Sequence, residues 1–146
     1  MVFEHTITVA APIEKVFALV DDAEQLKLWM DGLEETVFTG PVDRDNPVGA
    51  AFRRRIREGG RISEYEGRIT AYEKPRHFAV TVGNRHFSMH LTYRFTPVAD
   101  GTRVNHEAGV TTHTVFARLM SILFAWLTRR ILRKQLAKLK QVAEAN

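Results

Sequence analysis

Cysteine is absent from the sequence of 146 residues, which excludes disulfides, thiolate metal sites and cysteine nucleophiles and fits a reducing compartment such as the cytoplasm. No signal peptide is recognisable, because the first residues, MVFEHTITVA, alternate between apolar and polar side chains. The most apolar stretch, VFARLMSILFAWL, is shorter than the about twenty residues of a membrane-spanning helix. We therefore expect a cytoplasmic chain that forms a single domain over residues 1–146, with 45% apolar residues to fill its core.

The patterns that mark nucleic-acid-binding proteins are also missing, although the net charge is +4. The chain has no basic strand with interleaved aromatic residues, no zinc-finger spacing and no glycine-rich phosphate loop. Seven Lys or Arg residues and one Glu follow Thr114, so this segment contributes +6 and the remainder −2. The positive charge is a local feature of the C-terminal segment, and we do not expect nucleic acid as a partner.

A strand followed by two short helices is predicted for the first part of the chain. The segment FEHTITVA has the period-two alternation of a half-buried strand. Pro12 suits the first turn of a helix, and an apolar stripe that includes Val16 and Phe17 follows it. The segment AEQLKLWMDG predicts a second short helix that ends near Gly32.

Two adjacent glycines predict the register of the next hairpin. A two-residue turn at Gly59-Gly60 pairs Glu58 with Arg61, and the pairing continues from there along both strands. On one side of this hairpin arginines stand opposite glutamates, as in Arg53 opposite Glu66, which predicts ion pairs between the two strands. The other side is the covered one, and it carries Phe52, Arg54, Ile56 and Tyr65.

The same alternation continues through three more strands. If EKPR is a loop, Ala71 lies opposite Phe78, and a tight turn at Asn84-Arg85 places Phe87 opposite Val82. The segment FTPVADGTRV makes the last connection. The side shared with Phe52 is then almost entirely apolar and carries Ile69, Val80, Val82, Met89, Leu91, Tyr93, Phe95, Val104, His106, Ala108 and Val110. We expect an antiparallel meander with one apolar face.

A helix without proline or glycine is predicted from Val115 to Ala145, and it alone is long enough to cover that face. Its leucines form two stripes, displaced from each other by roughly 130° around the helix axis. The first stripe contains Leu119, Leu123 and Leu127, and the second Leu132, Leu136 and Leu139. Because one straight face cannot hold both stripes, either the helix bends near Thr128 or its first half is covered on several sides.

The partner of that first half is left open by the sequence. A ligand, a second subunit in a homodimer, or an anionic membrane surface would each cover it, and the remaining alternative is a lid helix with a solvated basic end. A membrane surface would be attracted by the basic residues that follow, which are Arg129, Arg130, Arg133, Lys134, Lys138 and Lys140. In that case the cytoplasmic chain would be membrane-associated.

In this order the elements resemble the START-like helix-grip superfamily, also called SRPBCC, which includes polyketide cyclase/dehydrase and lipid-transport proteins. The resemblance covers nearly the whole chain and rests on TITVAAPIEKVFALVDD, LWMDGLEETV, GRITAYEKPRHF, TYRFTPVADGTRV and LAKLKQVAE. It implies an α+β helix-grip fold, in which a curved antiparallel sheet wraps around a long C-terminal helix and two short helices after the first strand help to close an apolar cavity. Asp31 departs from the family pattern, because many relatives have proline there.

The expected site lies in this cavity between the sheet and the C-terminal helix. Arg54 needs a partner on the covered face, either a carboxylate such as Glu35 or a ligand. His106 and Tyr93 form the best candidate acid/base pair for catalysis, although both also suit a core in which they bond to backbone or water. The expected ligand-binding residues are Trp29, Phe52, Arg54, Tyr65, Ile69, Val80, Met89, Leu91, Tyr93, His106, Leu119 and Leu123.

The expected function is binding or carriage of a small hydrophobic or amphipathic molecule, such as a lipid, an isoprenoid or a polyketide-like compound, without a cofactor. Two alternatives stay open: a polyketide cyclase, aromatase or dehydratase, and a protein-interaction module that uses the same groove. We favour a role without catalysis, since the few polar residues of the covered face form no known catalytic signature and no serine or threonine lies in a nucleophile motif. No metal site is expected either, because His5, His106 and His113 lack a carboxylate at ligand spacing.

Overall fold

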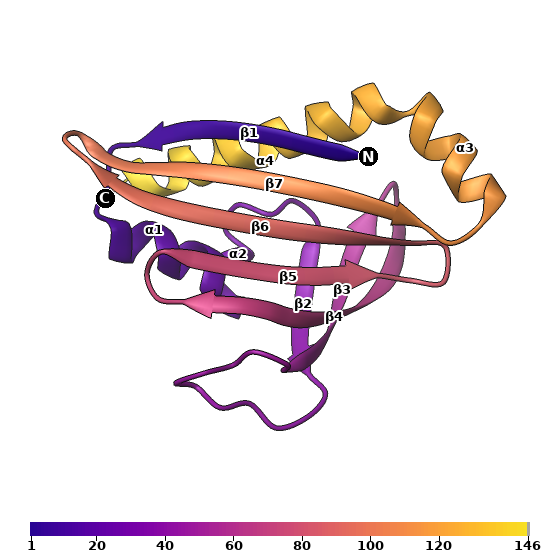
Figure 1. Ribbon diagram of the computed structural model, residues 1–146, viewed down its shortest axis with the longest axis horizontal. Helices are drawn as coiled ribbons and strands as arrows, with labels where there is room; N and C mark the ends of the chain where they lie inside the picture. Colours follow the sequence, from indigo (N-terminus) through magenta and orange to yellow (C-terminus); the bar gives the residue numbers. More distant parts are fainter. Residues whose placement is uncertain (146) are drawn as a thin grey trace.

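The computed structural model describes residues 1–145, and its strands form one antiparallel sheet (Figure 1). The order of the strands across the sheet is β1-β7-β6-β5-β4-β3-β2, so the first strand pairs with the last. Their bounds are β1 Val2–Val9, β2 Leu33–Phe38, β3 Ala51–Glu58, β4 Arg61–Glu73, β5 His77–Gly83, β6 Phe87–Val98 and β7 Gly101–Thr112. The predicted meander is confirmed.

Helices precede and follow this meander. Helix α1 (Ile13–Asp21) begins after Pro12, and α2 (Ala23–Leu26) begins after Asp22, whose side chain accepts a hydrogen bond from the Glu24 backbone N–H (2.8 Å). At the end of the chain lie α3 (Val115–Leu123) and α4 (Ala125–Glu144). None of the described helices is both long and apolar enough to cross a bilayer.

The hairpin between β3 and β4 has the predicted register, but its ion pairs go elsewhere. Gly59 and Gly60 have φ angles of 55° and 82°, which glycine adopts without strain, and Glu58 pairs with Arg61. Two arginines of β3 bind glutamates of β2 instead of β4, because β2 lies on their other side. The observed pairs are Arg55–Glu35 (3.8 Å) and Arg57–Glu34 (3.3 Å). The expected ion pairs between β3 and β4 were therefore wrong.

Two details of the later strands also differ from the prediction. A bulge between Ile69 and Ala71 shifts the pairing of β4 with β5, so that Ala71 lies opposite Ala79. The turn between β5 and β6 is longer than expected, and Val82 pairs with Met89. Since this second shift is of two residues, the same side chains still point to the same face.

The core lies between the face of the sheet that α4 covers, here called the inner face, and the helices. Phe17 of α1 is fully buried and makes edge-to-face contacts with Tyr72, Phe78 and Phe95. The predicted assignment of the inner face is confirmed at its buried positions, which include Phe52, Ile69, Val80, Leu91, Tyr93, Phe95, Val104 and Ala108. From α4, Leu132, Leu136, Leu139 and Ala143 complete this core.

The expected continuous C-terminal helix is broken at Phe124, four residues before the predicted bend at Thr128. Phe124 has φ −107° and ψ 20°, outside the α-helical region, and it separates α3 from α4. Of the two leucine stripes only the second is buried, while α3 has no buried residue. The break lets α4 present its stripe to the sheet, and α3 lies beyond the end of β7 at an angle to α4 (Figure 1).

The last turns of α4 are bonded to the N-terminal part of the chain. The Glu144 carboxylate accepts hydrogen bonds from the Ala10 backbone N–H (2.8 Å) and from Lys140 Nζ (2.8 Å). Lys140 also donates to the Thr8 carbonyl (2.9 Å), and Lys138 pairs with Asp31. The second half of the C-terminal segment is thus anchored on the sheet, in contrast to α3.

Candidate functional site

The inner face of the sheet is closed at one end and open at the other. Along β3, burial decreases from Phe52 and Arg54 to Ile56 and then to the exposed Glu58. On the neighbouring strands, the burial of the inner-face side chains decreases at the same level along the sheet. The reason is that α3 does not lie over this end of the strands. The half-buried apolar residues at this level, here called the open end, are Ile56, Tyr65, Phe87, Met89 and Val110. Part of the apolar inner face is therefore accessible beside the closed core.

Arg54 lies at the boundary between the closed core and the open end. Its side chain is 6% exposed, and among the residues that the structure describes it has no ion pair and no hydrogen bond. The predicted partner Glu35 pairs with Arg55 instead. Its guanidinium carbon lies 4.8 Å from the centre of the Phe52 ring. Burial lowers the pKa of Arg54 to about 10, so that the side chain is still a cation at neutral pH.

A small internal cavity adjoins Arg54. Its volume is about 20 Å³, room for about one water molecule. Two buried polar atoms without a hydrogen-bond partner belong to residues that line it, Arg54 Nε and Thr36 Oγ1. Asp21 also lines it, and its carboxylate accepts a hydrogen bond from the Tyr72 hydroxyl (3.2 Å); burial raises the pKa of Asp21. The remaining walls are mainly apolar: Val20, Ala23, Leu26, Phe38, Phe52, Ile69, Phe78 and Val80.

Tyr93 and His106 are stacked next to this region, on the paired strands β6 and β7. Their ring centres are 4.2 Å apart and the rings are nearly parallel. His106 Nδ1 lies 3.1 Å from the Thr92 carbonyl oxygen, which only accepts, so the proton is on Nδ1 and Nε2 carries the lone pair. Burial lowers the pKa of His106 to about 4 and raises that of Tyr93 to about 12. Both side chains are uncharged at neutral pH.

Tyr65 is directed to the rim of the sheet rather than to its cross-strand partner Arg54. Its hydroxyl donates to the Glu58 carboxylate, with oxygen distances of 2.9 and 3.1 Å. Burial, together with Glu58, raises the pKa of Tyr65 to about 12. Arg54 and Tyr65 are both among the expected ligand-binding residues and lie opposite each other on β3 and β4, but their polar groups have different neighbours.

The other predicted site residues fall into two groups. Trp29 is 1% exposed, donates from Nε1 to the Leu19 carbonyl (2.7 Å) and packs edge-on against Tyr93. With it in or against the core are Phe52, Ile69, Val80, Met89 and Leu91. By contrast, Leu119 and Leu123 lie on α3 and are 55% and 57% exposed. The structure thus brings the other predicted residues together and leaves these two apart.

Some residues near Arg54 were not singled out from the sequence. Thr36, Asp21 and Leu26 line the small cavity, although they come from β2 and from the two short helices. No local pattern marks them, because their proximity to Arg54 depends on how the helices pack on the sheet. Within residues 1–145, no group of three His, Asp or Glu side chains is placed to hold a metal ion.

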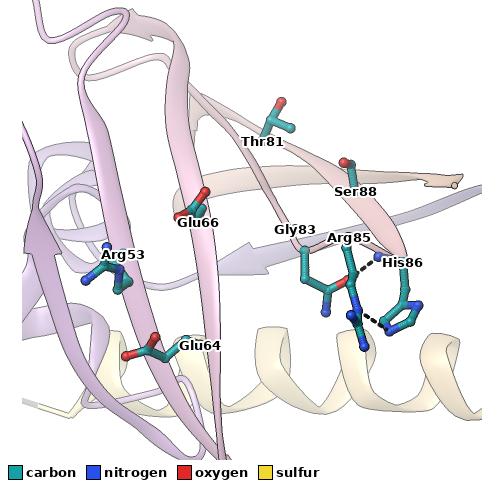
Figure 2. Close-up of a pocket in the computed structure, with 9 residues that line it drawn as sticks. Arg53, Glu64, Glu66, Thr81, Gly83, Arg85, His86 and Ser88 are labelled. Atoms are coloured by element: carbon teal, nitrogen blue, oxygen red, sulfur yellow. Dashed lines mark hydrogen bonds between the residues drawn. The ribbon is translucent and has the colours of Figure 1, made fainter.

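A larger hollow lies on the opposite, outer face of the sheet (Figure 2). It has a volume of about 750 Å³ and is wide open to solvent. Arg53, Glu64 and Glu66 project into it from β3 and β4, and Arg85 donates to His86 Nε2 (3.3 Å) in the turn before β6. Because its charged side chains are exposed and hydrated, the hollow has no buried charge that would need a ligand. We therefore place the candidate site on the inner face, at Arg54.

A curved antiparallel sheet that holds a C-terminal helix, with two short helices after its first strand, is the helix-grip fold. The chain belongs to the family described as polyketide cyclase / dehydrase and lipid transport, whose model matches residues 1–144. No curated protein matches the sequence at a significant level.

Solved structures share the fold at low sequence identity. A protein of Thermus thermophilus has a TM-score of 0.76 at 18% identity, with all of both chains covered. The solution structure of a Bacillus halodurans protein has a TM-score of 0.74 at 19% identity, covering 99% of this chain and 97% of that one. The di-domain ARO/CYC StfQ from the steffimycin biosynthetic pathway has a TM-score of 0.74 at 13% identity, covering 98% of this chain and 50% of StfQ. At these identities the likeness shows the fold alone.

Proposed function

We propose that the protein binds an amphipathic small molecule with an anionic group, such as a fatty acid or a polyketide-like carboxylic acid, whose anionic end pairs with Arg54. The observation that supports this most directly is a guanidinium that is 6% exposed and has no counterion among the described residues. A buried cation without a partner lowers stability, so it needs another reason to be present. An anionic ligand would supply the missing partner and would accept two parallel hydrogen bonds.

The surroundings of Arg54 suit such a ligand. The anionic end would take the place of the single water that fits beside Arg54 and Thr36, and the hydroxyl of Thr36 would donate a further hydrogen bond. The apolar part would cover the open end of the inner face, where Met89 and Phe87 are only half-buried. Since the internal cavity is small, most of the apolar contact would be made at the open end rather than deep in the core.

Carriage or sensing is better supported than catalysis. A cyclase or dehydratase is the second candidate, because the family description includes these activities and StfQ is an ARO/CYC. It would use His106 and Tyr93 as acid and base. With a pKa of about 4, however, His106 is protonated in only about one molecule in a thousand at pH 7, and its neutral form is a weak base.

Arg54→Met is expected to weaken the binding of a fluorescent fatty acid by about thirtyfold, because it removes a charge-assisted bidentate contact and keeps the side-chain volume. The free energy of unfolding of the unliganded protein should stay the same or increase, since a buried unpaired charge is lost. Fluorescence titration measures the first effect and urea denaturation the second.

Two controls make this experiment specific. Arg55→Met changes the adjacent arginine, which is exposed on the outer face and pairs with Glu35, and it should bind the fatty acid as the wild type does. The methyl ester of the same fatty acid, which lacks the charge, should bind wild type and Arg54→Met equally. Equal affinity of the free acid for wild type and Arg54→Met would contradict the proposal.

A further inference from the structure

Besides the unpaired Arg54, the molecule has an apolar surface that no other element within residues 1–145 covers. It extends from α3 into the first turns of α4, and none of the residues of α3 is buried. Among its side chains Val115 is 87% exposed, Phe116 69%, and Ile122 and Trp126 59% each. Large apolar side chains clustered at such exposure mark a contact surface rather than ordinary surface composition.

The cations beside this surface have no ion-pair partner. Arg118, Arg129, Arg130, Arg133 and Lys134 form no ion pair in the described part of the chain, and no acidic residue lies between Thr114 and Lys134. The two remaining basic residues expected to face a membrane, Lys138 and Lys140, are instead paired with Asp31 and Glu144. Within the C-terminal segment, all cations without an ion pair therefore lie next to the apolar surface.

We propose that α3 and the first half of α4 dock on an anionic lipid surface. In this position the apolar side chains would enter the headgroup region, while the five unpaired cations would contact the lipid phosphates. An exposed tryptophan such as Trp126, between the apolar residues and the arginines, suits the boundary between the two regions.

A second copy of the chain fits this surface less well than a bilayer does. A two-fold symmetric dimer would bring the same patch of both subunits together. The cations of the two copies would then approach one another without any acidic residue of the patch between them, which is unfavourable. An anionic bilayer instead offers an apolar phase and opposite charge at the same time.

This docking is independent of the proposed ligand, but it would give the open end a function. The open end lies on the strands beside which α3 begins, so a docked protein would hold it near the lipid. Arg54 is buried and is not part of this surface, and the Arg54→Met variant should therefore bind vesicles as the wild type does. Failure of one proposal is thus distinguishable from failure of the other.

Co-sedimentation with vesicles tests the proposal. The wild type is expected to bind vesicles of equal parts phosphatidylcholine and phosphatidylglycerol at low salt, to lose this binding as salt rises, and not to bind pure phosphatidylcholine. The fluorescence emission of Trp126 should shift to shorter wavelength on binding. The only other tryptophan, Trp29, is buried at 1% exposure and supplies a constant background.

Two variants separate the charged from the apolar contribution. Exchanging Arg130 and Lys134 for glutamate should lower partitioning into anionic vesicles at least about tenfold. Leu119→Asp should also lower it at least about tenfold, because aspartate replaces an inserting apolar side chain and adds a repelled charge. Leu28→Asp is the matched control: Leu28 is as exposed as Leu119, 54% against 55%, but lies outside the surface, and its variant should keep most of the binding.

Two results would overturn the proposal. One is a wild type that ignores anionic vesicles even at low salt. The other is a wild-type dimer in analytical ultracentrifugation that Leu119→Asp converts to a monomer, since the surface would then be occupied by a second copy.

Discussion

Val104→Asp is expected to destabilise the protein by at least about 4 kcal/mol, which is enough to unfold a marginally stable domain. Val104 is 0% exposed and lies in the centre of β7, opposite Phe95 on one side and Ile7 on the other. Aspartate there would lose the apolar contacts of valine and would place a carboxylate among groups that cannot hydrogen-bond it. Urea denaturation followed by circular dichroism measures the loss.

The neighbouring position provides a control for this variant. Asn105→Asp introduces the same residue one position along the strand, where the side chain points to the outer face and lies opposite Arg94. Its effect on the free energy of unfolding should be small, because the new charge is hydrated and near a cation. Similar destabilisation by both variants would contradict the assignment of the inner face.

Acid is expected to destabilise the protein through His106 by about 3 kcal/mol. The pKa of His106 is about 4 in the folded protein because the ring is buried, against an ordinary value of 6.5. The unfolded chain therefore binds a proton more readily than the folded one. The stability is fully present above pH 6.5, decreases as the pH falls from 6.5 to 4, and is completely lost below that range.

His106→Phe isolates this contribution from the other groups that titrate in acid. Phenylalanine keeps an aromatic ring on Tyr93 and has no proton to gain. Between about pH 7 and about pH 4, the wild type should lose about 3 kcal/mol more stability than the variant does. Parallel pH profiles for the two proteins would show that His106 is not buried in the neutral form.

The faces of the strands followed from sequence because side chains alternate with period two. Phe52, Val80 and Val104 are buried where the alternation placed them. The register of the strands was harder to predict from sequence, since it depends on the length of each turn. At the turn before β6, the Asn84 side chain accepts hydrogen bonds from the His86 and Phe87 backbone N–H groups (2.8 and 3.2 Å), which holds a longer loop than the expected one. A shift of two residues preserves the faces and changes the partners.

Arg54 was recognised from the sequence as a cation on a covered face, but its partner was not. Glu35 was a reasonable candidate until the pairing of β2 with β3 placed it opposite Arg55. The residues that adjoin Arg54 in the small cavity, Thr36 and Asp21, come from separate elements. Such proximity is a property of tertiary packing, and no local pattern encodes it.

Local periodicity and composition were enough to predict the order of the elements, the apolar face of the sheet and the charge of the C-terminal segment. The position of the break in the C-terminal helix, and which of its residues are covered, depend instead on tertiary packing. Two leucine stripes on different sides cannot both contact one sheet. The sheet binds the stripe around Leu136, and Lys140 and Glu144 anchor the turns that follow it. As a result the large apolar side chains between Val115 and Trp126 are left exposed, next to cations that have no ion-pair partner.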